Sequence, residues 1–207
     1  MDLFFEIFTV ITGIIYVVLE IKQKNFMWVV GVLTALGAMY VFFTKGLYCS
    51  FGLNVYYFCI SFWGLYCWRR DRDKIRHQLE SAENASGEVI HLNRLPVKTV
   101  IISTVVAIIS VFVLSWLMAR LENPQSWLDS AVAVLSAVAT WWLSRAYKQQ
   151  WILWIVADAL STVMCLIQGM WWMSALYAVY TLSAAVGLGH WNKYGIYLDE
   201  RKNDTDC

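Results

Sequence analysis

The chain repeats the stretch GLYCSFGLNVYYFCISFWGLYCW (residues 46–68) as GMWWMSALYAVYTLSAAVGLGHW (residues 169–191), at an offset of 123 residues. Four matched pairs carry this repeat: Leu53 and Leu176, Tyr57 and Tyr180, Gly64 and Gly187, and Trp68 and Trp191. A second offset, of 126 residues, places Trp28 on Trp154, which indicates that the two copies differ slightly in length. Duplication in an apolar chain is typical of membrane transporters, in which two similar halves enclose a site between them.

The composition indicates an integral membrane protein. Of the 207 residues, 59% are hydrophobic and only 15% are charged, which lies outside the usual range of soluble domains. Seven mostly apolar runs are each long enough to cross about 30 Å of hydrocarbon as a helix. They cover residues 3–21, 26–44, 47–68, 98–118, 127–146, 151–168 and 170–191. We therefore predict an all-α membrane fold with seven transmembrane helices.

The distribution of basic residues predicts the orientation of these helices. If the N-terminus is outside, only Lys45 and Arg120 fall on the outer side, and the other lysines and arginines fall on the inner side. Because cytoplasmic connections carry an excess of basic residues, we predict an N-out, C-in topology.

A long polar connection over residues 69–97 divides the chain. It separates a first triple-helix bundle (1–68) from a linker helix (98–118), a second bundle (127–191) and a tail (192–207). Because the linker helix returns the chain to the outer face, the two triplets have the same orientation, in a 3+1+3 arrangement of parallel repeats. We interpret the connection and the tail as cytoplasmic, with the basic run as an anchor near the lipid headgroups.

Polar and aromatic side chains near the middle of the spans predict the binding site, because such residues are costly in lipid unless they line a cavity or pair with one another. The candidates are Asn54 and Tyr57 on the third span, Trp154 and Asp158 on the sixth, and Tyr177 and Tyr180 on the seventh. On each of these spans the two residues lie close to one helix face. Aromatic rings beside a negative charge suit a flat, cationic aromatic ligand.

Asp158 is the only acid that this interpretation places deep within a span. Two roles for it stay open. Its carboxylate lines the translocation path, or hydrogen bonds from Ser161, Thr162 or Tyr180 hold it as a packing feature.

Tryptophans and glycines near the span ends allow further predictions. Four tryptophans close to span ends, Trp68, Trp116, Trp127 and Trp191, are interpreted as part of the aromatic belt at the water–lipid boundary. Trp28 and Trp151, near the cytoplasmic boundary, are candidate gate residues. Gly31, Gly37, Gly64 and Gly187 are expected to allow close helix packing.

The sequence offers no constellation for catalysis or for a cofactor. His77, His91 and His190 lie in or beside connections, and no two of them have the spacing of metal ligands. Paired carboxylates, a glycine-rich phosphate loop and a nucleophile elbow are also absent from the sequence. We therefore predict a protein that is not an enzyme and that binds no cofactor, metal or nucleic acid.

Three motifs resemble the PnuC family of bacterial vitamin transporters. They are KQKNFMW (residues 22–28), the run from GLY through NVYY to GLYCW within residues 46–68, and QWILW (residues 150–154) followed by Asp158. The resemblance implies a fold similar to two fused SWEET-type triple-helix bundles and a homotrimer in the bacterial inner membrane. It also implies facilitated diffusion of nicotinamide riboside without ion coupling, and a functional link to a cytoplasmic kinase that traps the vitamin by phosphorylation.

The substrate stays open between two vitamins. Family members commonly carry glutamine where this chain has Asn54, and a similar branch, PnuT, is associated with thiamine. Both vitamins are flat aromatic cations with a hydroxyl-bearing arm, and one methylene at this residue changes discrimination by only about 1–3 kcal/mol. More distant alternatives are a SWEET-type sugar carrier and a membrane receptor or assembly subunit that does not transport.

Overall fold

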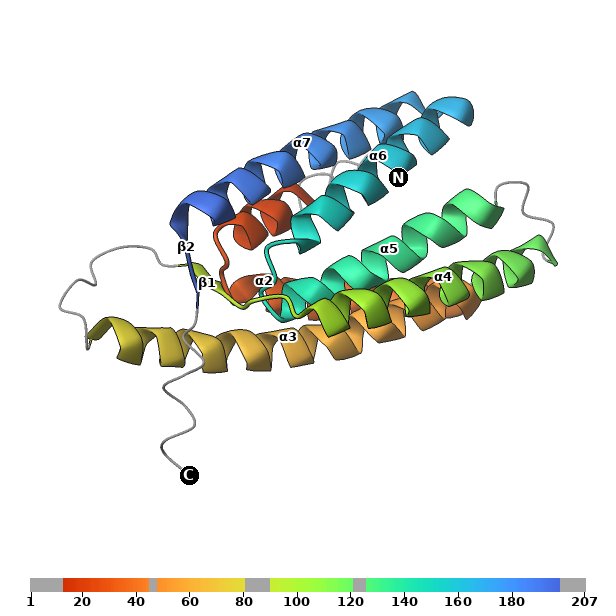
Figure 1. Cartoon of the computed structure of the whole chain (residues 1–207). Helices are drawn as coiled ribbons and strands as arrows, with labels where there is room; N and C mark the ends of the chain where they lie inside the picture. Colours follow the sequence, from red (N-terminus) through yellow and green to blue (C-terminus); the bar gives the residue numbers. More distant parts are fainter. Residues whose placement is uncertain (1–12, 45–47, 81–89, 121–125, 198–207) are drawn as a thin grey trace.

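The computed structural model describes residues 13–44, 48–80, 90–120 and 126–197. Within these residues the chain forms seven helices and one small sheet (Figure 1). The elements are a first helix over residues 13–21, α2 (Phe26–Thr44), α3 (Tyr48–Glu80), β1 (Ile90–Leu92), α4 (Val97–Ala119), α5 (Ser126–Ser144), α6 (Gln150–Ile167), α7 (Trp171–Tyr194) and β2 (Gly195–Tyr197). The predicted helical fold is confirmed, with the two-stranded sheet as an addition that was not predicted.

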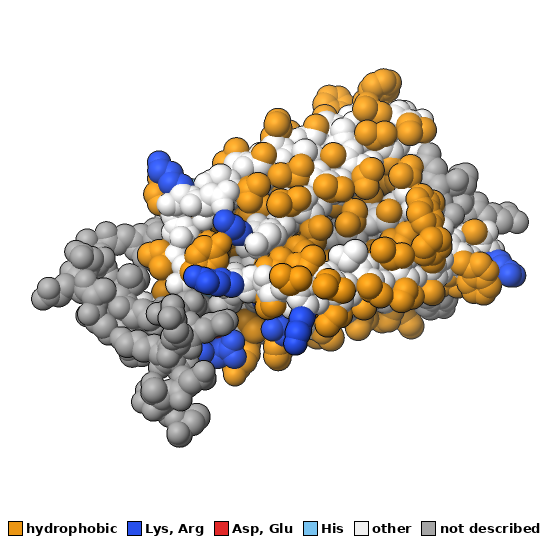
Figure 2. Space-filling view, in the orientation of Figure 1, with side chains coloured by type: hydrophobic (Ala, Val, Ile, Leu, Met, Phe, Trp, Pro, Cys, Tyr) orange, Lys and Arg blue, Asp and Glu red, His pale blue; other side chains and the backbone are white. Residues whose placement is uncertain are grey.

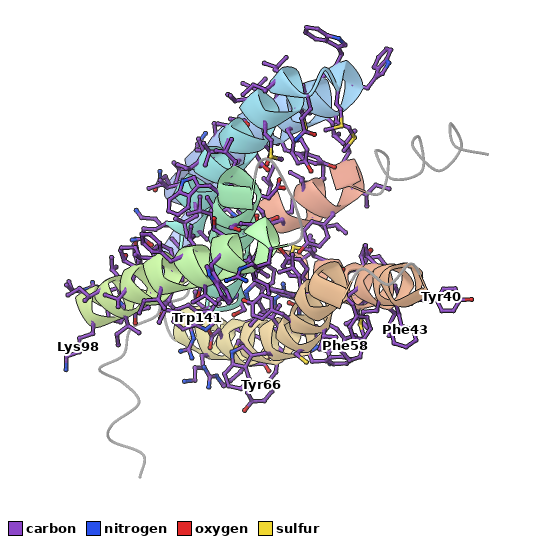
Figure 3. All side chains as sticks on the ribbon, turned by 90° about the vertical axis from the view of Figure 1, so that its right-hand side faces the viewer. Tyr40, Phe43, Phe58, Tyr66, Lys98 and Trp141 are labelled. Carbon is purple, nitrogen blue, oxygen red and sulfur yellow. The ribbon has the colours of Figure 1, made fainter. Side chains whose placement is uncertain are left out.

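Apolar side chains cover the outside of the helices. By length and composition, α4, α5, α6 and α7 could each cross a membrane. Figure 2 shows hydrophobic side chains along most of one face, with lysine and arginine gathered near the ends. In Figure 3, Tyr40 and Tyr66 point away from the bundle, and they are 74% and 59% exposed. In water such a surface would be costly, whereas in lipid it is matched to its surroundings.

The helix α3 is longer than the predicted span. The sequence predicts a loop over residues 69–97, but α3 continues to Glu80 and β1 follows at Ile90. The continuation is rich in arginine, lysine, glutamine and glutamate, which have long unbranched side chains and high helix propensity. Because these residues are charged, the apolar run ends at Trp68, whereas the helix continues to Glu80.

Most of the basic side chains lie at one end of the molecule, which we call the basic end. They belong to the ends of the first helix and of α5 and α7, to the start of α6 and to the extension of α3, as Lys22, Lys24, Arg69, Arg70, Arg72, Lys74, Arg76, Arg145, Lys148 and Lys193. The small sheet also lies here, because β1 pairs in parallel with β2, with Ile90 opposite Gly195. It joins the connection after α3 to the segment after α7.

Gln23 fixes this sheet to the first helix. Its side-chain Nε2 donates to the carbonyl oxygen of His91 over 2.9 Å, and its Oε1 accepts from the backbone N–H of His91 over 2.9 Å. The backbone of Gln23 is in the left-handed region, with a φ of 49°. Arg72 donates to the Gln23 carbonyl oxygen over 2.8 Å and so ties the extension of α3 to the same point.

Two indole hydrogen bonds link the first helix to α7 and α5 to α3. The indole Nε1 of Trp191 in α7 donates to the carbonyl oxygen of Ile21 over 3.0 Å. In the same way, the indole Nε1 of Trp68 in α3 donates to the carbonyl oxygen of Leu143, near the end of α5, over 3.0 Å. Both indoles are fully buried. Their assignment to an aromatic belt is therefore wrong, because each N–H satisfies a helix-end carbonyl inside the protein.

Two further tryptophans pack against the repeated glycines. A Cβ atom on Gly187 would lie 2.6 Å from the Cη2 atom of Trp151, and one on Gly64 would collide with the ring of Trp28. Each ring also meets the buried tryptophan of its own repeat edge to face, with centroids 5.1 Å and 5.6 Å apart. Close packing is thus confirmed at Gly64 and Gly187, and at Gly31 against Ser61, whereas the expectation for Gly37 is wrong, because a Cβ atom there meets nothing within 4 Å in the described structure. Trp28 corresponds to Trp151, so the second offset, which matches Trp28 with Trp154, is wrong and one offset of 123 residues holds here.

The burial of His91 predicts a pH-dependent stability. Its imidazole is 1% exposed, and burial lowers the pKa of His91 well below the ordinary value of 6.5, with Arg72 lowering it further and Asp71 opposing. The unfolded chain therefore binds a proton that the folded chain does not, in the pH range between the lowered value and 6.5. The free energy of unfolding therefore has its full value above pH 6.5. It falls as the pH falls from 6.5 towards the lowered pKa of His91.

We expect the melting temperature to fall between about pH 7.5 and pH 4.5, and to fall less in a His91→Gln variant. Thermal unfolding of both proteins across this range measures the difference. Identical pH dependence of the two proteins would contradict the assignment to His91.

Candidate functional site

A cavity of about 400 Å³ lies between the two repeats, and every described helix except α4 contributes to its wall. The lining residues are Gly13, Tyr16, Val17, Glu20, Val30, Gly31, Thr34, Ala35, Asn54, Tyr57, Ser61, Thr140, Trp151, Trp154, Asp158, Tyr180 and Ala184. This volume is within the usual range for small-molecule sites. Of the packed tryptophans only Trp151 lines the cavity, and Trp28, Trp68 and Trp191 do not.

The repeat is visible in the wall of the cavity. Five pairs of lining residues are related by the offset of 123: Val17 and Thr140, Gly31 and Trp154, Ala35 and Asp158, Tyr57 and Tyr180, and Ser61 and Ala184. Corresponding positions of both copies therefore meet in one space, as expected when two halves enclose a site between them.

Two of these pairs make the cavity asymmetric. Where α2 presents the small residues Gly31 and Ala35, α6 presents Trp154 and Asp158. A ring and a carboxylate thus project from one repeat, while the matching positions of the other repeat have little or no side chain. The two sides of the cavity therefore differ in chemistry, although corresponding helices form them.

Most of the residues that the sequence predicts for the site lie in the cavity wall. Five of the six predicted binding residues line the cavity: Asn54, Tyr57, Trp154, Asp158 and Tyr180. The sixth, Tyr177, is not among the lining residues, but its ring packs edge to face on Tyr180 with centroids 6.2 Å apart. Of the two candidate gate residues, Trp151 lines the cavity and Trp28 does not.

The environment of Asp158 bears on its two interpretations. Ser161 donates to the carbonyl oxygen of Ala157 over 2.9 Å, and Thr162 donates to the backbone carbonyl oxygen of Asp158 over 2.8 Å. Both hydroxyls satisfy backbone groups one turn earlier in α6 and are not engaged with the carboxylate. The half-buried carboxylate therefore faces the cavity without support from these two neighbours.

The structure adds a second acid that the sequence interpretation did not select. Glu20 is 3% exposed and lines the cavity together with Gly13, Tyr16 and Val17 from the same helix. The prediction placed Glu20 at the end of the first span, where an acid is unremarkable. The signal was the spacing i, i+3, i+4 and i+7, which puts these four residues on one helix face.

The cavity is acidic. Two acidic residues, Glu20 and Asp158, line it, and the described lining residues include no lysine, arginine or histidine. Buried indole N–H groups of Trp151 and Trp154 also border it without a hydrogen-bond partner in the described part of the chain. Among the described residues, no group of three histidine, cysteine, aspartate or glutamate side chains could hold a metal ion.

Comparisons with known proteins agree with this architecture. The chain matches the nicotinamide mononucleotide transporter family over residues 3–193. The nicotinamide riboside transporter PnuC of Escherichia coli (strain K12) is 27% identical over 165 residues, covering 73% of this chain and 69% of the relative. The PnuC of Neisseria mucosa is 25% identical over 193 residues, covering 88% and 70%. The crystal structure of the vitamin B3 transporter PnuC shares the fold, with a TM-score of 0.64 and 23% identity over 89% of this chain and 79% of the other.

Proposed function

Because the chain belongs to the nicotinamide mononucleotide transporter family, we propose that it carries nicotinamide riboside, a flat aromatic cation, across the membrane through this cavity. The chain is a multi-pass membrane transporter and not an enzyme. The choice of substrate is our proposal, and it rests on the chemistry of the cavity wall.

The observation that carries the proposal is the sign of the charge in the cavity. Glu20 and Asp158 attract a cation, and the rings of Tyr57, Trp154 and Tyr180 offer faces on which an aromatic cation can stack. A mononucleotide carries a phosphate dianion, which these carboxylates repel and which no described lining side chain neutralises. The wall therefore favours the riboside over its phosphate ester.

We infer the transport cycle from the repeat. The two triplets, in a 3+1+3 arrangement with the N-terminus outside and the C-terminus in the cytoplasm, rock about the cavity and expose it to each side in turn. We propose that Trp28 and Trp151, whose rings pack against Gly64 and Gly187, act as gate residues at the basic end. Transport is uniport in the bacterial inner membrane, the protein is a homotrimer, and a cytoplasmic kinase traps the vitamin.

Calorimetric titration of the purified protein tests the substrate. We expect nicotinamide riboside to bind with micromolar affinity, and nicotinamide mononucleotide to bind at least about tenfold more weakly, because its phosphate is repelled. Thiamine, a second aromatic cation, is titrated alongside. Binding of thiamine alone would assign the chain to the thiamine branch, and tighter binding of the mononucleotide would contradict the charge argument.

A further inference from the structure

Glu20 presents a buried carboxyl group to the cavity with one oxygen unsatisfied. Its side chain is 3% exposed, and Oε1 has no hydrogen-bond partner in the described part of the chain. The offset of 123 places Leu143 at the matching position of the other repeat, where it is part of the apolar core. A buried carboxylate oxygen without a partner is costly, so a ligand group that donates to it would remove a penalty as well as add a contact.

Unsatisfied donors lie at the same end of the cavity as Glu20. The indole N–H groups of Trp151 and Trp154 are both buried, and neither has a partner among the described residues. Gln150, which begins α6, lies beside Glu20, so Trp151 and Glu20 are close to the same end of the cavity. The side-chain amide of Gln150 also has no partner among the described residues, so acceptors and donors are both unsatisfied in this part of the cavity.

These unsatisfied polar atoms restrict the chemistry of a ligand group that can hydrogen-bond to all of them. The group has to donate to a carboxylate and accept from an indole N–H, which a second cationic centre cannot do because it offers no lone pair. Hydroxyls of a sugar do both, and so does an aminopyrimidine, through its amino group and its ring nitrogens. Asp158 lies seven residues beyond Trp151, about 10 Å along α6, so the two acids suit the two ends of one ligand.

We propose that Glu20 is a specificity-determining residue, whose carboxylate binds the uncharged polar arm of the substrate while Asp158 faces the cationic ring. The inference rests on the proposed function and extends it, because it fixes the direction in which the substrate lies. The arm points to the basic end, and the ring lies deeper in the bundle. The ribose of nicotinamide riboside and the aminopyrimidine of thiamine share the required chemistry.

Binding of complete and arm-less ligands to Glu20 variants tests this assignment. The pairs are nicotinamide riboside with the N-methylnicotinamidium cation, and thiamine with its N-methylated thiazolium ring alone. In Glu20→Leu we expect the complete ligand to bind about 10- to 100-fold more weakly, and the arm-less cation, which loses only the attraction of a more distant charge, to weaken by at least about fivefold less. Glu20→Gln keeps the size and one acceptor, so its loss should be smaller. Binding of the riboside pair to the wild type would identify the arm as a ribose, and binding of the thiamine pair would identify it as an aminopyrimidine.

Melting temperatures without ligand distinguish a structural role of Glu20 from a role in binding. Leucine occupies the matching position 143, so Glu20→Leu should melt at or above the wild-type temperature in the absence of ligand. Asp73→Asn, which alters an exposed acid on the extension of α3, is the control for general effects of charge. A lowered melting temperature with equal weakening of both ligands would overturn the assignment, as would unchanged binding of the complete ligand. If the wild type binds none of the four ligands, the proposed function fails, and the assignment fails with it.

Discussion

Replacement of Asp158 by asparagine should weaken the binding of nicotinamide riboside by about 30- to 1,000-fold. The carboxylate is the charge that α6 presents where α2 has Ala35, and the hydroxyls of Ser161 and Thr162 are bound to backbone carbonyls. A cation beside it is held in surroundings that screen charge less than water does, so loss of the negative charge removes a large part of the affinity. Calorimetry on the purified variant measures the change.

The empty Asp158→Asn protein should melt no lower than the wild type, because the substitution removes a buried charge without changing the shape of the side chain. Asp73→Asn is the matched control, since it makes the same exchange on an exposed residue of α3. Wild-type affinity for the cation in Asp158→Asn would remove this carboxylate from the site. A large loss of melting temperature would instead favour a packing role.

The second large effect is expected at Gly187, where alanine should lower the melting temperature by about 5–10 °C or prevent folding. The added Cβ atom would lie 2.6 Å from a ring carbon of Trp151, which real contacts do not tolerate. That ring cannot move aside easily, because it packs edge to face on Trp191 with centroids 5.6 Å apart. Displacement of Trp151 towards the cavity would also reduce ligand binding.

Gly189→Ala supplies the control two residues away on the same helix. A Cβ atom there meets nothing within 4 Å in the described structure, so this variant should melt at or slightly above the wild-type temperature. Equal melting temperatures of Gly187→Ala and Gly189→Ala would show that the tryptophan packing does not constrain the helix. The repeat predicts a second sensitive position at Gly64, against Trp28.

Much of the fold could be predicted because membrane helices are apolar throughout. The helix α2 begins and ends at the residues predicted for it, 26 and 44, and α4 extends the predicted 98–118 by one residue at each end. The extension of α3 was missed because charged residues also form helices where they reach water. The pairing of β1 with β2 could not be predicted, because it joins short segments more than 100 residues apart in the chain.

The site was partly predictable because polar side chains stand out within apolar membrane helices. Tyr57 and Asp158 were selected by their depth in the spans, and both line the cavity. Depth counted from span ends is a coarse measure, however, and it passed over Glu20 while selecting Tyr177, which packs behind Tyr180. Which face of each helix meets the cavity depends on contacts between segments far apart in the chain, such as those of the first helix with α7 and of α5 with α3. The sequence does not show these contacts.

Counterflow in proteoliposomes tests most directly whether the cavity carries an aromatic cation across the membrane. Vesicles loaded with unlabelled nicotinamide riboside are placed in labelled substrate, with no kinase and no ion gradient. We predict transient accumulation of label with the wild type and with Asp73→Asn, and little or none with Asp158→Asn. Equal counterflow with Asp158→Asn and the wild type, or none with the wild type for either vitamin, would contradict the account.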